Sequence, residues 1–277
     1  MVTRRDLQLP DGRQLVAYDS GALDPSEALT VVWHHGSPQT GAPLEPLLAA
    51  AAARDIRLVT YARPSYGGSS PNLGRKVASA AADVAAIVDA LGVSRFASMG
   101  ASGGGPHALA CAALLSDRVI GAITLASPAP YTDAFDWYGG MVSPGGLRAA
   151  AAGRDARDRF AAAEEFDENS FTSADWAALN GTWASLGRDA GQAGEAGPDG
   201  LIDDDVAFAS AWGFDVAEIT GPVLLVQGGE DRVIPPTHAE WLLRHVPSAE
   251  LWLRPRDGHV SVLDACPVGM DWLLDLG

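Results

Sequence analysis

The stretch FASMGASGGGPHALACAALL (residues 96–115) decides the fold. Its first four residues form an apolar run that predicts a buried strand, and residues 105–115 form a second run that predicts a helix. Between the two lies Gly100-Ala101-Ser102-Gly103-Gly104, a G-x-S-x-G pattern. A serine on such a sharp strand-to-helix turn projects from the edge of a sheet, and glycines two residues before and after it avoid a collision. The stretch therefore predicts an α/β architecture in which Ser102 is a nucleophile.

The same order of strand and helix extends to both sides of this stretch. The N-terminal residues predict a hairpin that turns at Pro10-Asp11-Gly12. Further predicted elements are strands at 29–33, 56–61, 119–126, 222–227 and 250–254, and helices at 43–54, 75–91, 236–245 and 260–275. Because these strands are apolar throughout rather than alternating, we expect a mostly parallel sheet with helices on both faces.

Residues 131–219 break this order, since no clear strand is found there. Helices are predicted at 146–166 and 173–186, followed by a soft, glycine-rich stretch at 187–200. The run Asp203-Asp204-Asp205 is interpreted as helix-capping or solvated rather than as a metal site. We therefore expect a core formed by residues 1–130 and 220–277, with residues 131–219 inserted as a helical cap, or lid.

A nucleophilic serine needs a base and an acid that orients the base. His259 follows the last predicted strand, and Asp231 follows the strand at 222–227, so both are expected at the same sheet edge as Ser102. Glu230 competes with Asp231 for the acid's role, and both could instead be solvated loop acids. The chain order Ser102, Asp231, His259 is the order typical of a hydrolase triad on this architecture.

Two backbone donors are expected to hold the negative oxygen that forms during acyl transfer. One is the N–H of Gly103, directly after the nucleophile, and the other is the N–H of Ser37, in the loop His34-His35-Gly36-Ser37-Pro38. The two adjacent histidines resemble metal ligands, but no Cys, His or carboxylate cluster at ligand spacing accompanies them. We therefore expect neither a metal nor a cofactor.

Composition excludes several classes of protein. The 277 residues are 47% hydrophobic and 19% charged, which supports a large folded core. A net charge of -16 disfavours nucleic acid as a partner, and the two cysteines cannot form a disulfide framework. No signal peptide or membrane span is evident, so a cytoplasmic protein that acts on a small molecule is expected, with a homo-oligomer left open.

These motifs, together with Arg63-Pro64-Ser65-Tyr66-Gly67-Gly68-Ser69, resemble the series found in the serine branch of the α/β-hydrolase superfamily. The resemblance covers residues 1–130 and 220–277 and is strongest to proline iminopeptidases, esterases and cofactor-free haloperoxidases. It implies an eight-stranded sheet with a helical cap over the serine. Iminopeptidases usually carry His-Gly-Gly-Pro-Gly and a bulky residue after the serine, whereas this chain has His-Gly-Ser-Pro and Gly103, which argues against a peptidase. A serine at position 102, where dehalogenases and epoxide hydrolases have a carboxylate, argues against those enzymes.

The leading hypothesis is thus a carboxylic ester hydrolase that forms an acyl-enzyme on a small ester, lactone or amide. The alternatives are an iminopeptidase-like aminopeptidase, a cofactor-free haloperoxidase or perhydrolase, a carbon–carbon bond hydrolase, and a receptor that binds a small ligand without catalysis. A cluster of acids at Glu164, Glu165, Asp167 and Glu168 could hold a substrate ammonium group, but it reads better as a solvated helix face. Neutral, moderately apolar esters or lactones are therefore expected over aminoacyl amides.

Overall fold

One eight-stranded sheet runs through the protein. The structure, a computed structural model, describes residues 1–22 and 28–277. The strands, in chain order, are β1 (Thr3–Gln8), β2 (Gln14–Asp19), β3 (Thr30–His34), β4 (Arg57–Tyr61), β5 (Phe96–Ala101), β6 (Val119–Leu125), β7 (Val223–Gly228) and β8 (Ala249–Arg254). Their order in space is β1-β2-β4-β3-β5-β6-β7-β8. The β1–β2 and β2–β4 pairs are antiparallel and the others parallel, which confirms the predicted fold class.

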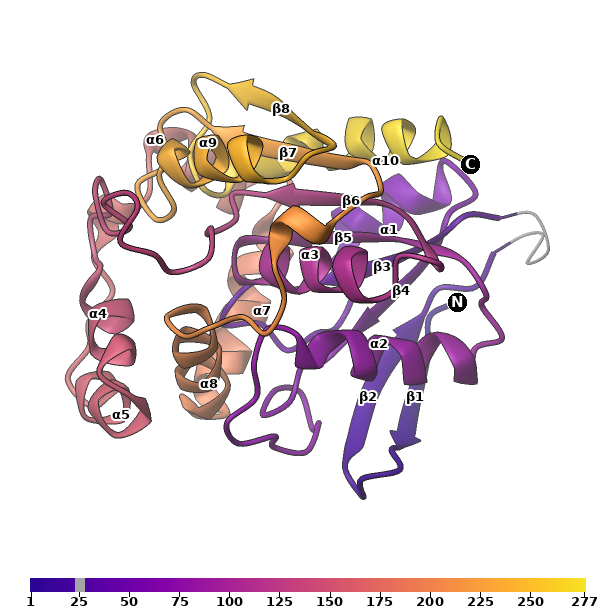
Figure 1. The fold of residues 1–277 in the computed structure, drawn as a ribbon, viewed down its shortest axis with the longest axis horizontal. Coiled ribbons are helices and arrows are strands. Elements are labelled where there is room, and N and C mark those ends of the chain that lie inside the picture. Colours follow the sequence, from indigo (N-terminus) through magenta and orange to yellow (C-terminus); the bar gives the residue numbers. More distant parts are fainter. Residues whose placement is uncertain (23–27) are drawn as a thin grey trace.

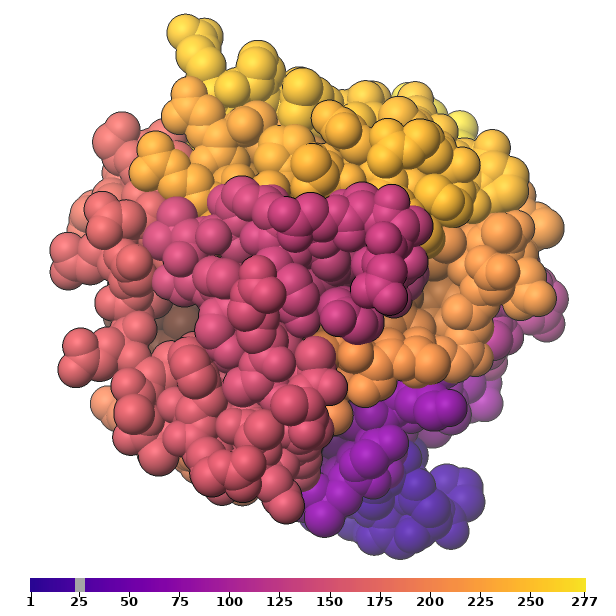
Figure 2. Space-filling model, turned by 60° about the vertical axis from the view of Figure 1, so that its left-hand side comes forward, coloured from indigo at the N-terminus to yellow at the C-terminus, as the bar shows by residue number. Residues whose placement is uncertain are grey.

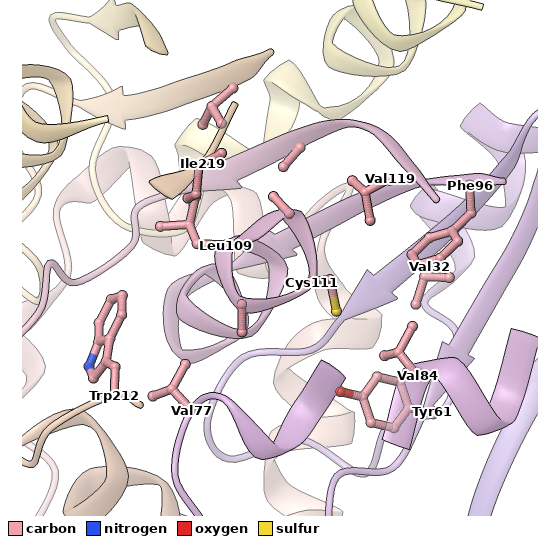
Figure 3. Packing of buried hydrophobic residues seen from close by; sticks show 14 of the residues in the cluster. Val32, Tyr61, Val77, Val84, Phe96, Leu109, Cys111, Val119, Trp212 and Ile219 are labelled. Atoms are coloured by element: carbon pink, nitrogen blue, oxygen red, sulfur yellow. The ribbon is translucent and has the colours of Figure 1, made fainter. Parts of the chain in front are cut away.

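Helices cover both faces of the sheet (Figure 1). The helices of the core are α1 (Glu45–Ala52), α2 (Ser79–Ala90), α3 (Gly105–Leu114), α9 (Pro236–His245) and α10 (Cys266–Leu274). Side chains of α2, α3 and α9 form one buried cluster with the sheet. Val84 and Leu109 are fully covered in it (Figure 3), and Leu242 of α9 is 1% exposed. Side chains of α1 and α10 form a second cluster, which includes Leu47 and Met270. The inner strands β3 to β7 are therefore largely apolar because both faces of the sheet are buried there, whereas the edge strands β1 and β8 are partly exposed.

Between β6 and β7 the chain carries α4 (Gly145–Ala151), α5 (Arg154–Ala161), α6 (Ser173–Leu179), α7 (Ala184–Glu195) and α8 (Asp199–Phe208). We call residues 131–219 the helical insertion; no strand lies in it, and all of it is described. Trp183 belongs to one core cluster and Phe208 to the other, so the insertion packs on both. Figure 2 shows a hollow in its surface, bordered by the atoms coloured red.

Three predictions about this segment are wrong. The helix expected at 173–186 is divided into α6, which ends at Leu179, and α7, which begins at Ala184. The helix expected at 146–166 is two helices, because Gly153 adopts a φ of 101° between them and α5 ends at Ala161. The stretch at 187–200, expected to be soft, is mostly helical, with α7 continuing to Glu195 and α8 beginning at Asp199. The glycines of α7 lower its intrinsic propensity, but its buried Asp189 and Ala193 fix it against the core, and such tertiary contacts override propensity.

No helix among residues 1–22 and 28–277 is both long and apolar enough to cross a membrane.

Candidate active site

Ser102 lies on a strained turn between β5 and α3. Its φ is 51°, in the left-handed region that side-chain-bearing residues rarely adopt. The glycines around it are required by space. A Cβ on Gly100 would lie 2.6 Å from the carbonyl carbon of Gly104, and a Cβ on Gly104 would lie 2.6 Å from that of His34. Backbone strain of this kind persists only where the surrounding structure enforces it, and it is typical of a functional site.

His259 joins Ser102 to Asp231 through both of its ring nitrogens. Its Nε2 lies 3.0 Å from Ser102 Oγ, and its Nδ1 lies 2.9 Å from Asp231 Oδ2. Because an ionised carboxylate can only accept, Nδ1–H donates to Asp231, and Nε2 is left to accept the hydroxyl proton of Ser102. The structure thus brings together three side chains from three separate loops.

Asp231 is the better of the two candidate acids on geometric grounds. It is 4% exposed, and its Oδ1 accepts hydrogen bonds of 2.9 Å from the N–H groups of Val233 and Ile234. Glu230 is exposed to solvent. Two backbone donors fix the Asp231 carboxylate, so its second oxygen remains directed at His259.

The electrostatic surroundings favour a basic imidazole. Burial alone lowers the pKa of His259, but the charge and hydrogen bond of Asp231, together with the charge of Asp175, outweigh burial and raise that pKa above 6.5. A raised pKa makes the imidazole a stronger base, which favours proton transfer from a hydroxyl to Nε2.

The loop that carries Ser37 lies beside Ser102 and Gly103. A Cβ placed on Gly36 would be 3.6 Å from Ser102 Cβ, and one placed on Gly103 would collide with Ser37 Oγ. That same Cβ would lie 3.0 Å from the ring of Phe208, at the end of α8. A side chain at position 103 has no room, because the space it would fill is occupied by Ser37 and by Phe208 of the insertion.

Arg63, two residues after the end of β4, fixes the loop that carries Ser37. The guanidinium donates to the carbonyl of His35, to that of Gly36 at 3.2 Å and to Ser37 Oγ at 3.0 Å. It also pairs at 2.6 Å with Asp204 Oδ2, whose other oxygen accepts from Arg75 at 2.7 Å. Burial alone would raise the pKa of Asp204, but the two arginines hold it well below its usual value. A carboxylate of the insertion thus lies at the centre of this cationic cluster.

The prediction that Asp203-Asp204-Asp205 is capping or solvated is wrong. All three side chains are buried within α8. Arginines provide their partners, with Arg154 on Asp203 and Arg157 on Asp205. Because Arg63 and Arg75 are distant in sequence, the run itself carries no signal of this burial.

The histidines His34 and His107 make contacts that are typical of structural residues. His34 is buried, and its ring contacts Tyr61 Oη and Ser98 Oγ. His107 Nδ1 lies 2.8 Å from the carbonyl oxygen of Gly103. Within residues 1–22 and 28–277, no three His, Cys, Asp or Glu side chains are grouped as metal ligands would be.

The family of the chain follows from comparison with known proteins. A model of the α/β-hydrolase fold family matches residues 30–265, which is most of the sequence. The chain belongs to the α/β-hydrolase family. No curated protein sequence matches it.

Solved structures of this family share its fold. An esterase from Thermogutta terrifontis has a TM-score of 0.74 at 19% identity, with 100% of this chain and 99% of that one covered. An enol-lactonase from Burkholderia xenovorans LB400 has a TM-score of 0.72 at 18% identity, with 96% and 97% covered. A bromoperoxidase from Bacillus anthracis has a TM-score of 0.72 at 20% identity, with 100% and 98% covered. At these identities, the likeness extends to the fold alone.

One feature of the site was missed by sequence reasoning. Asp175, in α6, is fully buried and accepts hydrogen bonds from the backbone on the C-terminal side of His259. No motif surrounds it, and its sequence context, Thr172-Ser173-Ala174-Asp175, reads only as a helix cap.

Proposed function

We propose that the protein is a serine hydrolase that cleaves small neutral esters or lactones through an acyl-enzyme on Ser102. The observation that carries this proposal is the continuous hydrogen-bonded chain from Ser102 through His259 to Asp231, with Ser102 held at a φ of 51°. An ordinary packing serine needs neither the strain nor a buried base.

The proposed reaction uses these side chains in two half-reactions. His259 Nε2 takes the Ser102 proton as Oγ attacks the substrate carbonyl carbon, and the N–H groups of Ser37 and Gly103 stabilise the resulting oxyanion. The imidazolium then protonates the departing alcohol, which leaves the acyl group on Oγ. A water molecule, deprotonated by the same imidazole, attacks the acyl-enzyme and releases the carboxylic acid and the free serine.

The surroundings support a neutral substrate. Phe208 presents an apolar ring beside Gly103, and the buried aspartates nearby are neutralised by arginines. Glu164, Glu165 and Glu168 are exposed to solvent; the first two follow the end of α5, and Glu168 begins η2 (Glu168–Ser170). Glu164 pairs with Arg157. This exposure favours their interpretation as solvated acids over a site for a substrate ammonium group. We further propose that residues 131–219 act as a cap over Ser102, with an apolar lining that excludes water.

The test is a parallel measurement of kcat/KM for a short-chain p-nitrophenyl ester, a simple lactone and proline p-nitroanilide. The proposal expects turnover of the ester or the lactone to exceed that of the amide. Faster turnover of the proline amide would instead support an aminopeptidase. Peracid formation from acetate and hydrogen peroxide, assayed on the same preparation, distinguishes a perhydrolase.

A further inference from the structure

A carboxylate of the helical insertion, that of Asp175, contacts the backbone next to His259, the candidate base. Asp175 Oδ1 accepts from the N–H groups of Val260 and Ser261, each at 2.8 Å, and from Ser261 Oγ at 2.9 Å. Gly258, on the other side of His259, has no room for a Cβ because the Asp175 carboxylate occupies that position. One carboxylate of α6 therefore contacts the backbone both before and after His259.

A capping role for α6 does not account for these contacts. In the capping box of α6, Asp175 Oδ2 accepts from the Thr172 N–H and hydroxyl, each at 2.9 Å. That arrangement uses one oxygen and functions equally well in solvent. The other oxygen is committed to three donors of a core loop 85 and 86 residues away in sequence, and the carboxylate is fully buried. Such burial is costly unless the charge is fully hydrogen-bonded, as it is here.

The contacts of Asp175 and Ser261 form a closed hydrogen-bonded ring with residues 258–261, which we call the base loop. Ser261 Oγ donates to Asp175 and accepts from the Gly258 N–H at 2.8 Å. The backbone of residues 258–261 is thus tied to itself and to α6, and the His259 side chain projects from the middle of this ring. A displacement of the loop would move Nε2 away from Ser102 Oγ.

We propose that Asp175 is a positioning residue for His259: a carboxylate carried by the insertion that fixes the base loop and so holds the imidazole between Ser102 and Asp231. This inference rests on the proposed function. It makes α6 a component of the catalytic site as well as of the cover over it.

The charge of Asp175 gives the inference a readout that a purely structural role lacks. The carboxylates whose charges act on His259 are Asp231, from the loop after β7, and Asp175, from α6, and each raises the pKa of the imidazole. Asp175 is itself ionised at neutral pH, because backbone donors overcome its burial and lower its pKa. Removal of its charge should lower the pKa of His259 and move the acid limb of the pH profile to lower pH.

The experiment compares Asp175→Asn with a matched control, Asp189→Asn. Asp189 is also a buried carboxylate of the insertion that accepts from the core, at Thr40 N–H and Oγ1, without any contact with His259. The readouts are kcat and KM for p-nitrophenyl acetate, and the rate of labelling by a fluorophosphonate probe from pH 5 to 9. The labelling rate reports the free enzyme's base without requiring the natural substrate.

We expect Asp175→Asn to lower kcat by roughly 10- to 100-fold with little change in KM, as is typical when an outer partner of an active-site group is lost. Its acid limb should shift to lower pH, and that of Asp189→Asn should stay in place. Equal profiles for the two variants, or an unchanged kcat in Asp175→Asn, would overturn the inference.

A second variant covers the case in which Asp175→Asn does not fold. Ser261→Ala keeps the buried charge and removes only the hydroxyl that closes the ring, and it should lower kcat several-fold without a change in KM. An unchanged kcat in that variant would overturn the inference. The proposed function is tested by a different result. A wild-type chain that the fluorophosphonate does not label would overturn the proposed function, whereas a labelled wild type with unaffected variants would overturn only the role of Asp175.

Discussion

The three loops at the sheet edge and the helical insertion contribute to the site in different ways. The loops owe their places to the parallel strands that precede them, so Ser102, Asp231 and His259 meet because β5, β7 and β8 end at one edge. The insertion packs on both core clusters and is also held by buried carboxylates. Asp175 contacts the loop of residues 258–261, Asp189 contacts Thr40, and Asp204 pairs with Arg63 and Arg75. The candidate catalytic residues are thus positioned by secondary structure, whereas the side chains that support them come from distant parts of the chain.

The largest expected effect falls on the loops. Ser102→Ala removes one hydroxyl and the covalent step with it, so we expect kcat for ester hydrolysis to fall by about 10⁴- to 10⁶-fold. The melting temperature should be nearly unchanged, because the insertion's attachments remain intact. Steady-state kinetics and a thermal melt check both expectations, and residual activity above a tenth of wild type would exclude Ser102 as the nucleophile.

Asp231→Asn should reduce kcat by roughly 10⁴-fold, because an amide stabilises the wrong imidazole tautomer. The matched control is Glu230→Gln, the exposed neighbour, which should change kcat by less than about twofold. Kinetics on the same ester decide between the two acids. If Glu230→Gln proved the more damaging variant, the acid would be assigned one residue too late.

Asp204→Asn tests the insertion's attachment. It leaves Arg63 and Arg75 buried with too little negative charge, and breaking a buried pair in this way costs about 3–5 kcal/mol of unfolding free energy. Asp199→Asn, which removes an exposed partner of Arg154, should cost less than about 0.5 kcal/mol. Urea denaturation measures both, and an equal, small effect would mean that the insertion merely lies on the core.

The smallest expected effect is a displacement of the pH profile. A general base works only as the neutral imidazole, and Asp231 and Asp175 raise the pKa of His259 above 6.5. Activity should therefore be lost as pH falls through a midpoint above 6.5. The pH dependence of kcat/KM for p-nitrophenyl acetate gives this midpoint, and a value clearly below 6.5 would contradict the electrostatic account.

Sequence reasoning succeeded where the signal is local. The strand at 96–99, its glycine turn and its helix occur within twenty residues, and β5, η1 (Ser102–Gly104) and α3 follow them. The structure places Asp231 and His259 within hydrogen-bond reach of each other and of Ser102, and their catalytic role stays a prediction. The boundaries of a separate cap at 131 and 219 also stay a prediction.

Sequence reasoning failed where partners are remote. Asp204 was predicted to be solvated because its partner Arg63 lies 141 residues away in the sequence. The residues near α8 give no indication of this ion pair. The glycines of α7 suggested a loop because its packing contacts are equally remote. Asp175 carried the signature of a helix cap and nothing more. A buried carboxylate and a solvated one look alike until the fold supplies the arginines or the backbone donors.

The central claim, that Ser102 is the nucleophile of a hydrolase, is tested most directly by covalent labelling. The folded protein is treated with a fluorophosphonate probe, and intact mass and peptide mapping locate the adduct. We predict one adduct per chain, on Ser102, in the wild type and none in Ser102→Ala. An unlabelled wild type, or equal labelling of Ser102→Ala, would contradict the account.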